Sequence, residues 1–77
     1  MTEEYAASRY EDACALLPGR LRAAAMSISQ REKARTEELR LRIGRALYLT
    51  TPAGETALPQ TRVIRSDLEQ VLDRATE

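Results

Sequence analysis

The chain has 77 residues, enough for one domain, and its 12 basic and 12 acidic side chains leave no net charge to draw it towards nucleic acid or anionic lipid. It contains no histidine and a single cysteine, Cys14, which excludes Ser-His or Cys-His nucleophilic chemistry, an internal disulfide and a self-contained zinc site. Phenylalanine and tryptophan are absent and much of the apolar content is alanine, so we expect a thin core that gains stability by packing against a partner.

The first part of the chain predicts helices. Apolar side chains spaced as i, i+3, i+4 and i+7 predict a helix over residues 2–17, with a stripe made of Tyr10, Ala13, Cys14 and Leu17. Pro18-Gly19 ends this helix, and the same spacing predicts a second, short one with a stripe made of Leu21, Ala24, Ala25 and Ile28. The run Ser29-Gln30-Arg31-Glu32 is a capping box, which predicts the start of a third, polar helix with little core contact.

Residues 37–49 predict a β-hairpin with two chemically different faces. Apolar residues at every second position predict one buried face, made of Leu39, Leu41, Ile43, Leu47 and Leu49. Gly44-Arg45 is a Gly-X pair of the kind that closes a hairpin with a two-residue connection. Because Arg40 and Arg42 point away from the apolar face, the hairpin offers a row of guanidinium groups made of Arg40, Arg42 and Arg45.

The remainder of the chain predicts one further strand and a last helix. Residues 51–55 are turn-rich, and residues 56–58 return as a third short strand that Pro59 ends. Residues 66–69, Ser-Asp-Leu-Glu, are a second capping box, followed by an apolar stripe made of Leu68, Val71, Leu72 and Ala75. The fold class is therefore α+β: residues 1–77 form a single domain in which N-terminal helices and one C-terminal helix pack on a small antiparallel sheet built around the hairpin.

Three segments carry a family resemblance through their order and spacing. They are Leu17-Pro18-Gly19-Arg20-Leu21-Arg22, residues 37–47 of the predicted hairpin, and Ser66-Asp67-Leu68-Glu69-Gln70-Val71-Leu72. Together they resemble the N-terminal region of the stage III sporulation protein AA family, which has a Leu-Pro, Arg-Leu-Arg helix turn, an Ile-Arg-Leu-Arg, Gly-Arg-Pro-Leu hairpin and an Asp-Leu helix. The chain departs from that pattern at Ala46, where the family usually has proline, and at Leu39, where isoleucine is common. Without the proline the turn is less rigid.

The resemblance covers nearly the whole chain and implies a secretion-type ATPase. Such proteins are related to type II and type IV secretion motors and act in the channel complex between mother cell and forespore, with the nucleotide-binding motor downstream of the matched region. This chain has glycines only at positions 19, 44 and 54, and none is followed by Lys-Ser or Lys-Thr, so it contains no P-loop. We therefore expect a non-catalytic accessory domain with no catalytic residue, metal site or cofactor of its own. The resemblance implies ATP and magnesium for the parent protein and docking on the downstream ATPase domain or a neighbouring subunit.

Two interpretations of Arg40, Arg42 and Arg45 remain open. The first is a solvated sheet face, or an edge kept soluble by charge. In the second, guanidinium groups, whose planar donors suit phosphate or carboxylate, contact a neighbouring subunit or a nucleotide held by the motor domain.

Other side chains have structural interpretations. Cys14, on an apolar stripe, is expected to be a small core residue, and Tyr48 is expected on the polar face beside an arginine. Nothing in the sequence suggests the sheltered cleft that Glu37 and Glu38 would need for acid-base catalysis, and Gly54 is expected to serve a turn that needs positive φ.

The rival function is a small nucleic-acid-binding module that places Arg40, Arg42, Arg45, Arg62 and Arg65 on phosphates. Zero net charge and sparse aromatic residues argue against nucleic acid as a partner. The N-terminus lacks the features of a signal peptide, and no apolar run approaches the roughly 20 residues of a membrane span. We expect a cytoplasmic protein without membrane insertion, placed at the periphery of a membrane complex by the resemblance.

Overall fold

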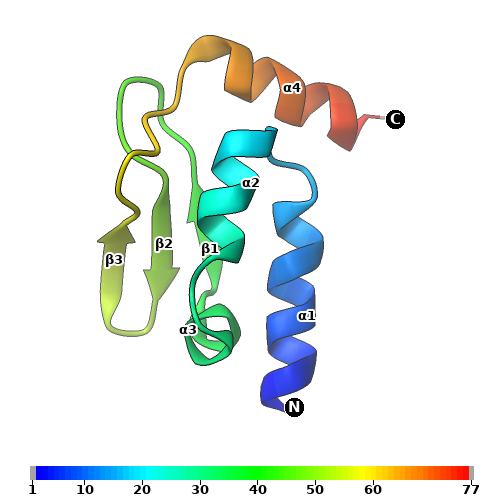
Figure 1. Cartoon of the computed structure of the whole chain (residues 1–77), viewed down its shortest axis with the longest axis vertical. Helices are drawn as coiled ribbons and strands as arrows, with labels where there is room; N and C mark the ends of the chain where they lie inside the picture. The colour runs from blue at the N-terminus through cyan, green and yellow to red at the C-terminus, as the bar shows by residue number, and fades with distance from the viewer. Residues whose placement is uncertain (1, 77) are drawn as a thin grey trace.

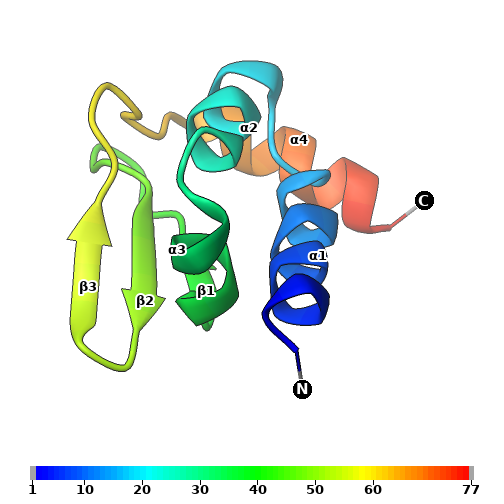
Figure 2. The same cartoon turned by 60° about the horizontal axis from the view of Figure 1, so that its bottom comes forward.

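The computed structural model describes residues 2–76, which form four helices and a three-stranded antiparallel sheet (Figure 1). The elements are α1 (Glu3–Cys14), α2 (Gly19–Met26), α3 (Gln30–Arg35), β1 (Glu38–Arg40), β2 (Tyr48–Thr51), β3 (Gly54–Ala57) and α4 (Arg65–Ala75). The strands lie in the order β1-β2-β3. Helices α1 and α2 face the sheet across the core, and α4 crosses one end of the fold (Figures 1 and 2). The predicted α+β class is confirmed.

Local signals set the first three helices. The Thr2 hydroxyl accepts a hydrogen bond from the Tyr5 amide at 3.1 Å and caps α1. Helix α1 ends at Cys14, earlier than predicted, although Leu17 beyond it is buried. Pro18 is the N-cap of α2, so Pro18-Gly19 separates the two helices as predicted.

The capping box that begins α3 is confirmed. The Ser29 hydroxyl accepts from the Glu32 amide at 3.1 Å, and the Glu32 carboxylate accepts from the Ser29 amide at 3.3 Å. No residue of α3 is buried, and the helix lies against α1, where Lys33 pairs with Glu11 at 2.7 Å.

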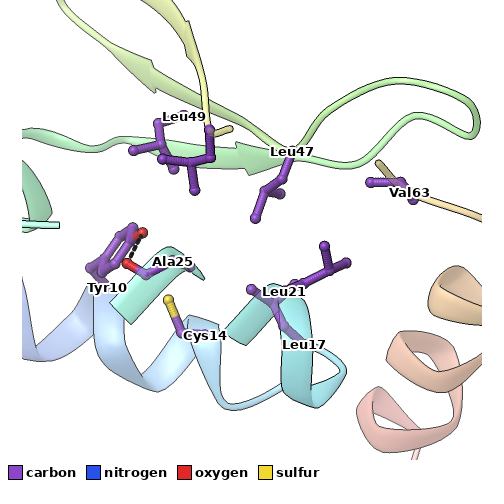
Figure 3. Close-up of a cluster of buried hydrophobic side chains, with 9 residues drawn as sticks. Tyr10, Cys14, Leu17, Leu21, Ala25, Leu47, Leu49 and Val63 are labelled. Atoms are coloured by element: carbon purple, nitrogen blue, oxygen red, sulfur yellow. Dashed lines mark hydrogen bonds between the residues drawn. The ribbon is translucent and has the colours of Figure 1, made fainter. Parts of the chain in front are cut away.

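The core lies between the sheet and the helices α1 and α2 (Figure 3). Its buried members are Tyr10, Cys14, Leu17, Leu21, Ala25, Leu47, Leu49, Leu58 and Val63. Five of these are leucine, one is valine, two are small and one is a tyrosine. So few large apolar side chains agree with the expectation of a thin core, since burying one large aliphatic side chain contributes only about 1.5–3 kcal/mol.

The predicted two-residue hairpin connection is wrong. Arg40 lies opposite Tyr48, so the strands end there and residues 41–47 form a longer connection. Within it the Gly44 amide donates to the Val63 carbonyl at 2.8 Å and the Val63 amide donates to the Arg45 carbonyl at 2.8 Å. The connection therefore pairs with residues 61–63 instead of folding straight back. Gly44 has a φ of +85°, which favours glycine.

This different path alters the predicted apolar face. Leu47 and Leu49 are buried as predicted, and Leu39 and Leu41 pack half-buried against the core. Ile43 was predicted to be buried, but 54% of its surface is exposed. The alternation fails at Ile43 because that residue lies in the turn of the connection, beyond the last paired residues of the strand.

The last helix is present, but its predicted cap is wrong. It begins at Arg65, and Ser66 is already inside it. Asp67 provides the cap: its carboxylate accepts from the Ile64 amide at 2.8 Å. The apolar stripe is only half correct, because Leu68 and Val71 pack against the core while Ala75 is exposed and Leu72 has 63% of its surface exposed.

The predicted third strand exists as β3. It spans Gly54–Ala57, so it begins two residues earlier than predicted, and Leu58 follows it and is buried. Gly54 has the predicted positive φ, +126°, but it is the first residue of β3, directly after the turn at residues 52–53. None of the helices within residues 2–76 combines the length and the apolar character that crossing a membrane needs.

Candidate interaction surfaces

Arg40 and Arg42 lie on the outer side of the sheet, as predicted, and both are paired with carboxylates. The Arg40 Nε atom lies 2.8 Å from Glu38 Oε1 and 3.5 Å from Glu55 Oε2. Arg42 Nη2 lies 3.3 Å from Glu55 Oε2. Hydrogen bonding to Glu38, and the charges of Glu38 and Glu55, raise the pKa of Arg40 above its usual value. Both arginines thus have carboxylate partners within their own chain.

Tyr48 lies on the same outer face, as predicted. The Arg42 Cζ atom stands 4.9 Å from the centroid of the Tyr48 ring, which is a cation–π contact. The aromatic ring is therefore already occupied by an arginine of its own chain. The charges of the outer face are paired with one another, although the Arg42 Nε atom is buried without a hydrogen-bond partner. This pairing agrees with the interpretation of Arg40 and Arg42 as a charged, solvated sheet face.

Arg45 has a different environment from Arg40 and Arg42. It is exposed in the connection 41–47, at the end of the fold where residues 61–64 and the start of α4 meet it (Figure 1). Arg62 and Arg65 are exposed in that neighbouring segment. Within residues 2–76, none of Arg45, Arg62 and Arg65 forms an ion pair. Three guanidinium groups at this end therefore keep their charge available.

Two large apolar side chains lie beside these arginines. Ile43 lies in the turn of the connection, and Ile64, with 49% of its surface exposed, is the N-cap of α4. The backbone bonds between residues 44–45 and Val63 bring these two segments together. We call the set Ile43, Arg45, Arg62, Ile64 and Arg65 the apex surface.

Polar contacts fix the backbone beneath the apex surface. Arg20 donates to the Arg62 carbonyl at 3.0 Å and pairs with the Asp67 carboxylate at 2.5 Å, while Asp67 also accepts from the Ile64 amide. Asp67 is buried with only 3% of its surface exposed, so its charge is compensated by Arg20 and by the start of α4. Sequence reasoning missed this pair because 47 positions separate its members. It placed Ile43 in the core and did not consider Ile64.

The single thiol has no reactive environment. Cys14 is fully buried, and burial raises its pKa. The adjacent Tyr10 is also buried, which raises the pKa of its phenol, and its hydroxyl donates to the Ala25 carbonyl at 2.8 Å (Figure 3). The expected core role of Cys14 agrees with this geometry. No group of three or more metal-ligating side chains gathers anywhere in the described part of the chain.

Comparison with protein-family models, with curated proteins and with solved structures finds no match.

Proposed function

We propose that this chain is a non-catalytic interaction domain of a sporulation secretion-type ATPase, which docks on the motor domain or on a neighbouring subunit through the apex surface. The observation that carries the proposal is the combination of two exposed isoleucines with three arginines that have no carboxylate partner among the described residues. Arginine is among the residue types that contribute most at the centre of protein interfaces, and exposed apolar side chains gain free energy when contact removes them from water. A cytoplasmic location beside a membrane channel complex is part of the same proposal.

The arrangement of the resembling segments supports the choice of this end. In residues 17–22, Arg20 contacts Arg62 and Asp67, and residues 44–45 of the hairpin segment pair with Val63. The third segment contributes Asp67 and the start of α4. Segments that are far apart in the sequence thus build one structural unit directly beneath the apex surface.

Nucleotide-dependent movement supplies the mechanism of the proposal. An acidic partner surface that pairs with Arg45, Arg62 and Arg65 gains charge-assisted hydrogen bonds, and Ile43 and Ile64 lose exposed apolar area on contact. A domain held in this way moves with the motor as nucleotide is bound and released. Arg40 and Arg42 take no part, because they are paired with Glu38 and Glu55.

The test starts from the reading frame that encodes these residues. A Gly-x-x-x-x-Gly-Lys-Thr or Gly-Lys-Ser segment beyond position 77 supports the proposal, whereas a reading frame without one contradicts the motor assignment. In the parent protein, reversing Arg45, Arg62 and Arg65 to glutamate is expected to weaken assembly at least about tenfold, as buried interface charges do. Reversal of Arg31 and Arg35 on α3 is the matched control and is expected to have little effect.

Titration with arbitrary DNA or RNA distinguishes the nucleic-acid rival. Arg45, Arg62 and Arg65 are the arginines left for phosphates, since Arg40 and Arg42 have carboxylate partners. Fluorescence anisotropy at low salt is expected to detect no tight binding. Tight binding that weakens steeply with added salt, and that disappears on reversal of these three arginines, would replace the docking proposal with the rival.

A further inference from the structure

A groove of about 430 Å³ runs between α1 and the free edge of the sheet. Its walls include Ala6, Arg9 and Ala13 of α1 on one side and Glu37, Glu38 and Leu39 on the other. Ala6, Arg9 and Ala13 fall on one stripe of α1, so a single face of the helix lines the groove. The alanines among the lining residues leave space that larger side chains would fill. The volume falls within the range of about 300–1,000 Å³ that is usual for ligand pockets.

The strand that borders this groove has an unpaired edge. In the β2–β3 pair the Leu58 amide donates to the Leu47 carbonyl at 2.9 Å, and the register continues through the facing residues Leu49 and Thr56. Alternation along an antiparallel ladder then turns the backbone groups of Tyr48 and Thr50 towards β1. The Thr50 carbonyl indeed accepts from the Glu37 amide at 2.7 Å.

The same alternation decides where the backbone of β1 points. Glu38 and Arg40, which face Thr50 and Tyr48, direct their amides and carbonyls towards β2. Leu39, between them, directs its amide and carbonyl away from β2, and β1 has no neighbour on that side. The Leu39 amide and the Leu39 carbonyl are thus one donor and one acceptor on the open edge of β1, beside the groove.

From this geometry we propose that the groove binds an extended peptide segment of another protein, which adds to the sheet as a fourth strand beside β1. An open strand edge flanked by a helix is the arrangement that β-strand addition uses: backbone bonds supply affinity and side-chain pockets supply specificity. The groove is lined by residues of α1, α3, β1 and the segment between α3 and β1, and none of them belongs to the apex surface. The proposed site therefore goes beyond the proposed function and does not depend on it.

The side chains around the groove determine which residue types the bound peptide would have. Leu39 packs half-buried towards the core, so the peptide residue beside it directs its side chain to the same face and into the space left by the alanines. That residue is apolar. Its two neighbours face the outer side of the sheet and are polar, because Glu38 and Arg40 lie there.

Charge adds a further requirement. Arg9 on the helix wall is exposed and makes no ion pair within residues 2–76. An acidic side chain at the end of the peptide nearest α1 pairs with it. Glu37 on the opposite wall is also exposed and makes no ion pair within residues 2–76, so a basic side chain of the peptide pairs with it. The occupant is therefore an extended segment with one apolar residue between polar ones, an acidic residue within reach of Arg9 and a basic residue within reach of Glu37.

The test uses a library of linear peptides displayed on phage and selected against the 77-residue chain, followed by titration of a synthetic peptide with the enriched sequence. We expect enriched sequences with the alternation and the acidic and basic residues described above. Ala13→Trp fills the groove, and Ala23→Trp on the exposed face of α2 is the matched control. The first substitution is expected to weaken binding at least about tenfold, and the second to leave it within about twofold.

A second pair of variants examines the charge. Arg9→Glu is expected to weaken binding several-fold with a marked salt dependence, whereas Arg31→Glu on α3 leaves it unchanged. Circular dichroism checks that each variant remains folded, since Ala13, Ala23, Arg9 and Arg31 are all exposed.

Amide hydrogen exchange provides a readout specific to strand addition. The Leu39 amide is expected to exchange rapidly in the free chain and to become protected with bound peptide, while the amides of Glu38 and Arg40 are protected in both states. Failure to enrich any sequence, equal effects of Ala13→Trp and Ala23→Trp, or an unprotected Leu39 amide in the bound state overturns the proposal. Protection of Leu39 without peptide, together with a dimer in sedimentation, would assign the edge to a second copy of the chain instead.

Discussion

Removal of the Tyr10 hydroxyl is expected to destabilise the fold by about 1–2 kcal/mol. The hydroxyl donates to the carbonyl of Ala25, which lies in the last turn of α2, where carbonyls have no partner inside the helix. Ala25 is fully buried, so water does not readily replace the lost donor. A net hydrogen bond contributes about 0.5–1.5 kcal/mol, and an orphaned buried acceptor costs about 1–3 kcal/mol. The expected loss of about 1–2 kcal/mol runs from the middle of the first range to the middle of the second.

Tyr10→Phe is the informative variant, because it keeps the ring in the core and deletes one atom. Tyr5→Phe is the matched control: Tyr5 lies on the same helix but has 53% of its surface exposed, and its change is expected to stay within about 0.5 kcal/mol. Urea denaturation followed by circular dichroism measures both, and each kcal/mol corresponds to about 4–8 °C in Tm for a domain of this size. Equal midpoints for Tyr10→Phe and Tyr5→Phe would refute the idea that this bond holds the end of α2 against α1.

Further substitutions examine the core, the turn and the thiol. Leu47→Ala is expected to cost about 2–5 kcal/mol in urea denaturation because the side chain is fully buried, whereas Leu72→Ala should change the free energy by less than about 0.5 kcal/mol. Gly44→Ala should lower the free energy of unfolding by about 1–2 kcal/mol, because Gly44 has a φ of +85°. An added Cβ would meet nothing within 4 Å, so the loss of stability would come from the backbone conformation alone. Burial raises the pKa of Cys14, so the unfolded chain releases that proton first and stability should fall as pH rises above about 8.5. Cys14→Ala should flatten this part of the stability–pH curve, and an unchanged slope would contradict the assignment.

The sequence predicts well those features that depend on neighbouring residues. The Ser29–Glu32 capping box is satisfied within four residues, so no distant contact alters it. The alternating core positions Leu47 and Leu49, and the partner of Tyr48, also follow from the period of a strand. The α+β class follows from the sum of such local signals.

The sequence fails where a distant segment decides the outcome. The connection 41–47 pairs with residues 61–63, and nothing near Gly44 reveals that partner. Asp67 competes with Ser66 for the start of α4, and Asp67 prevails because Arg20, far away in the chain, also binds it. Leu72 fits a helical stripe but finds no opposing element, because α4 crosses the end of the fold instead of lying along the core (Figure 1). In each case periodicity identifies the element and leaves its neighbour undetermined.

The attachment of α4 links the stability of the fold to the geometry of the apex surface. Asp67 is the only buried residue of this helix, and its charge is balanced by Arg20. At the other end Arg74 donates to the Leu17 carbonyl, to which Arg22 also donates at 3.0 Å. Helix α4 is thus held at one point by Arg20 in the first turn of α2 and at another by Leu17, in the turn between α1 and α2. Leu68 and Val71 add apolar contact with the core between these points. Because Ile64 and Arg65 lie at the start of this helix, we expect a partner that binds the apex surface to act directly on the Arg20–Asp67 attachment and to move α4 first.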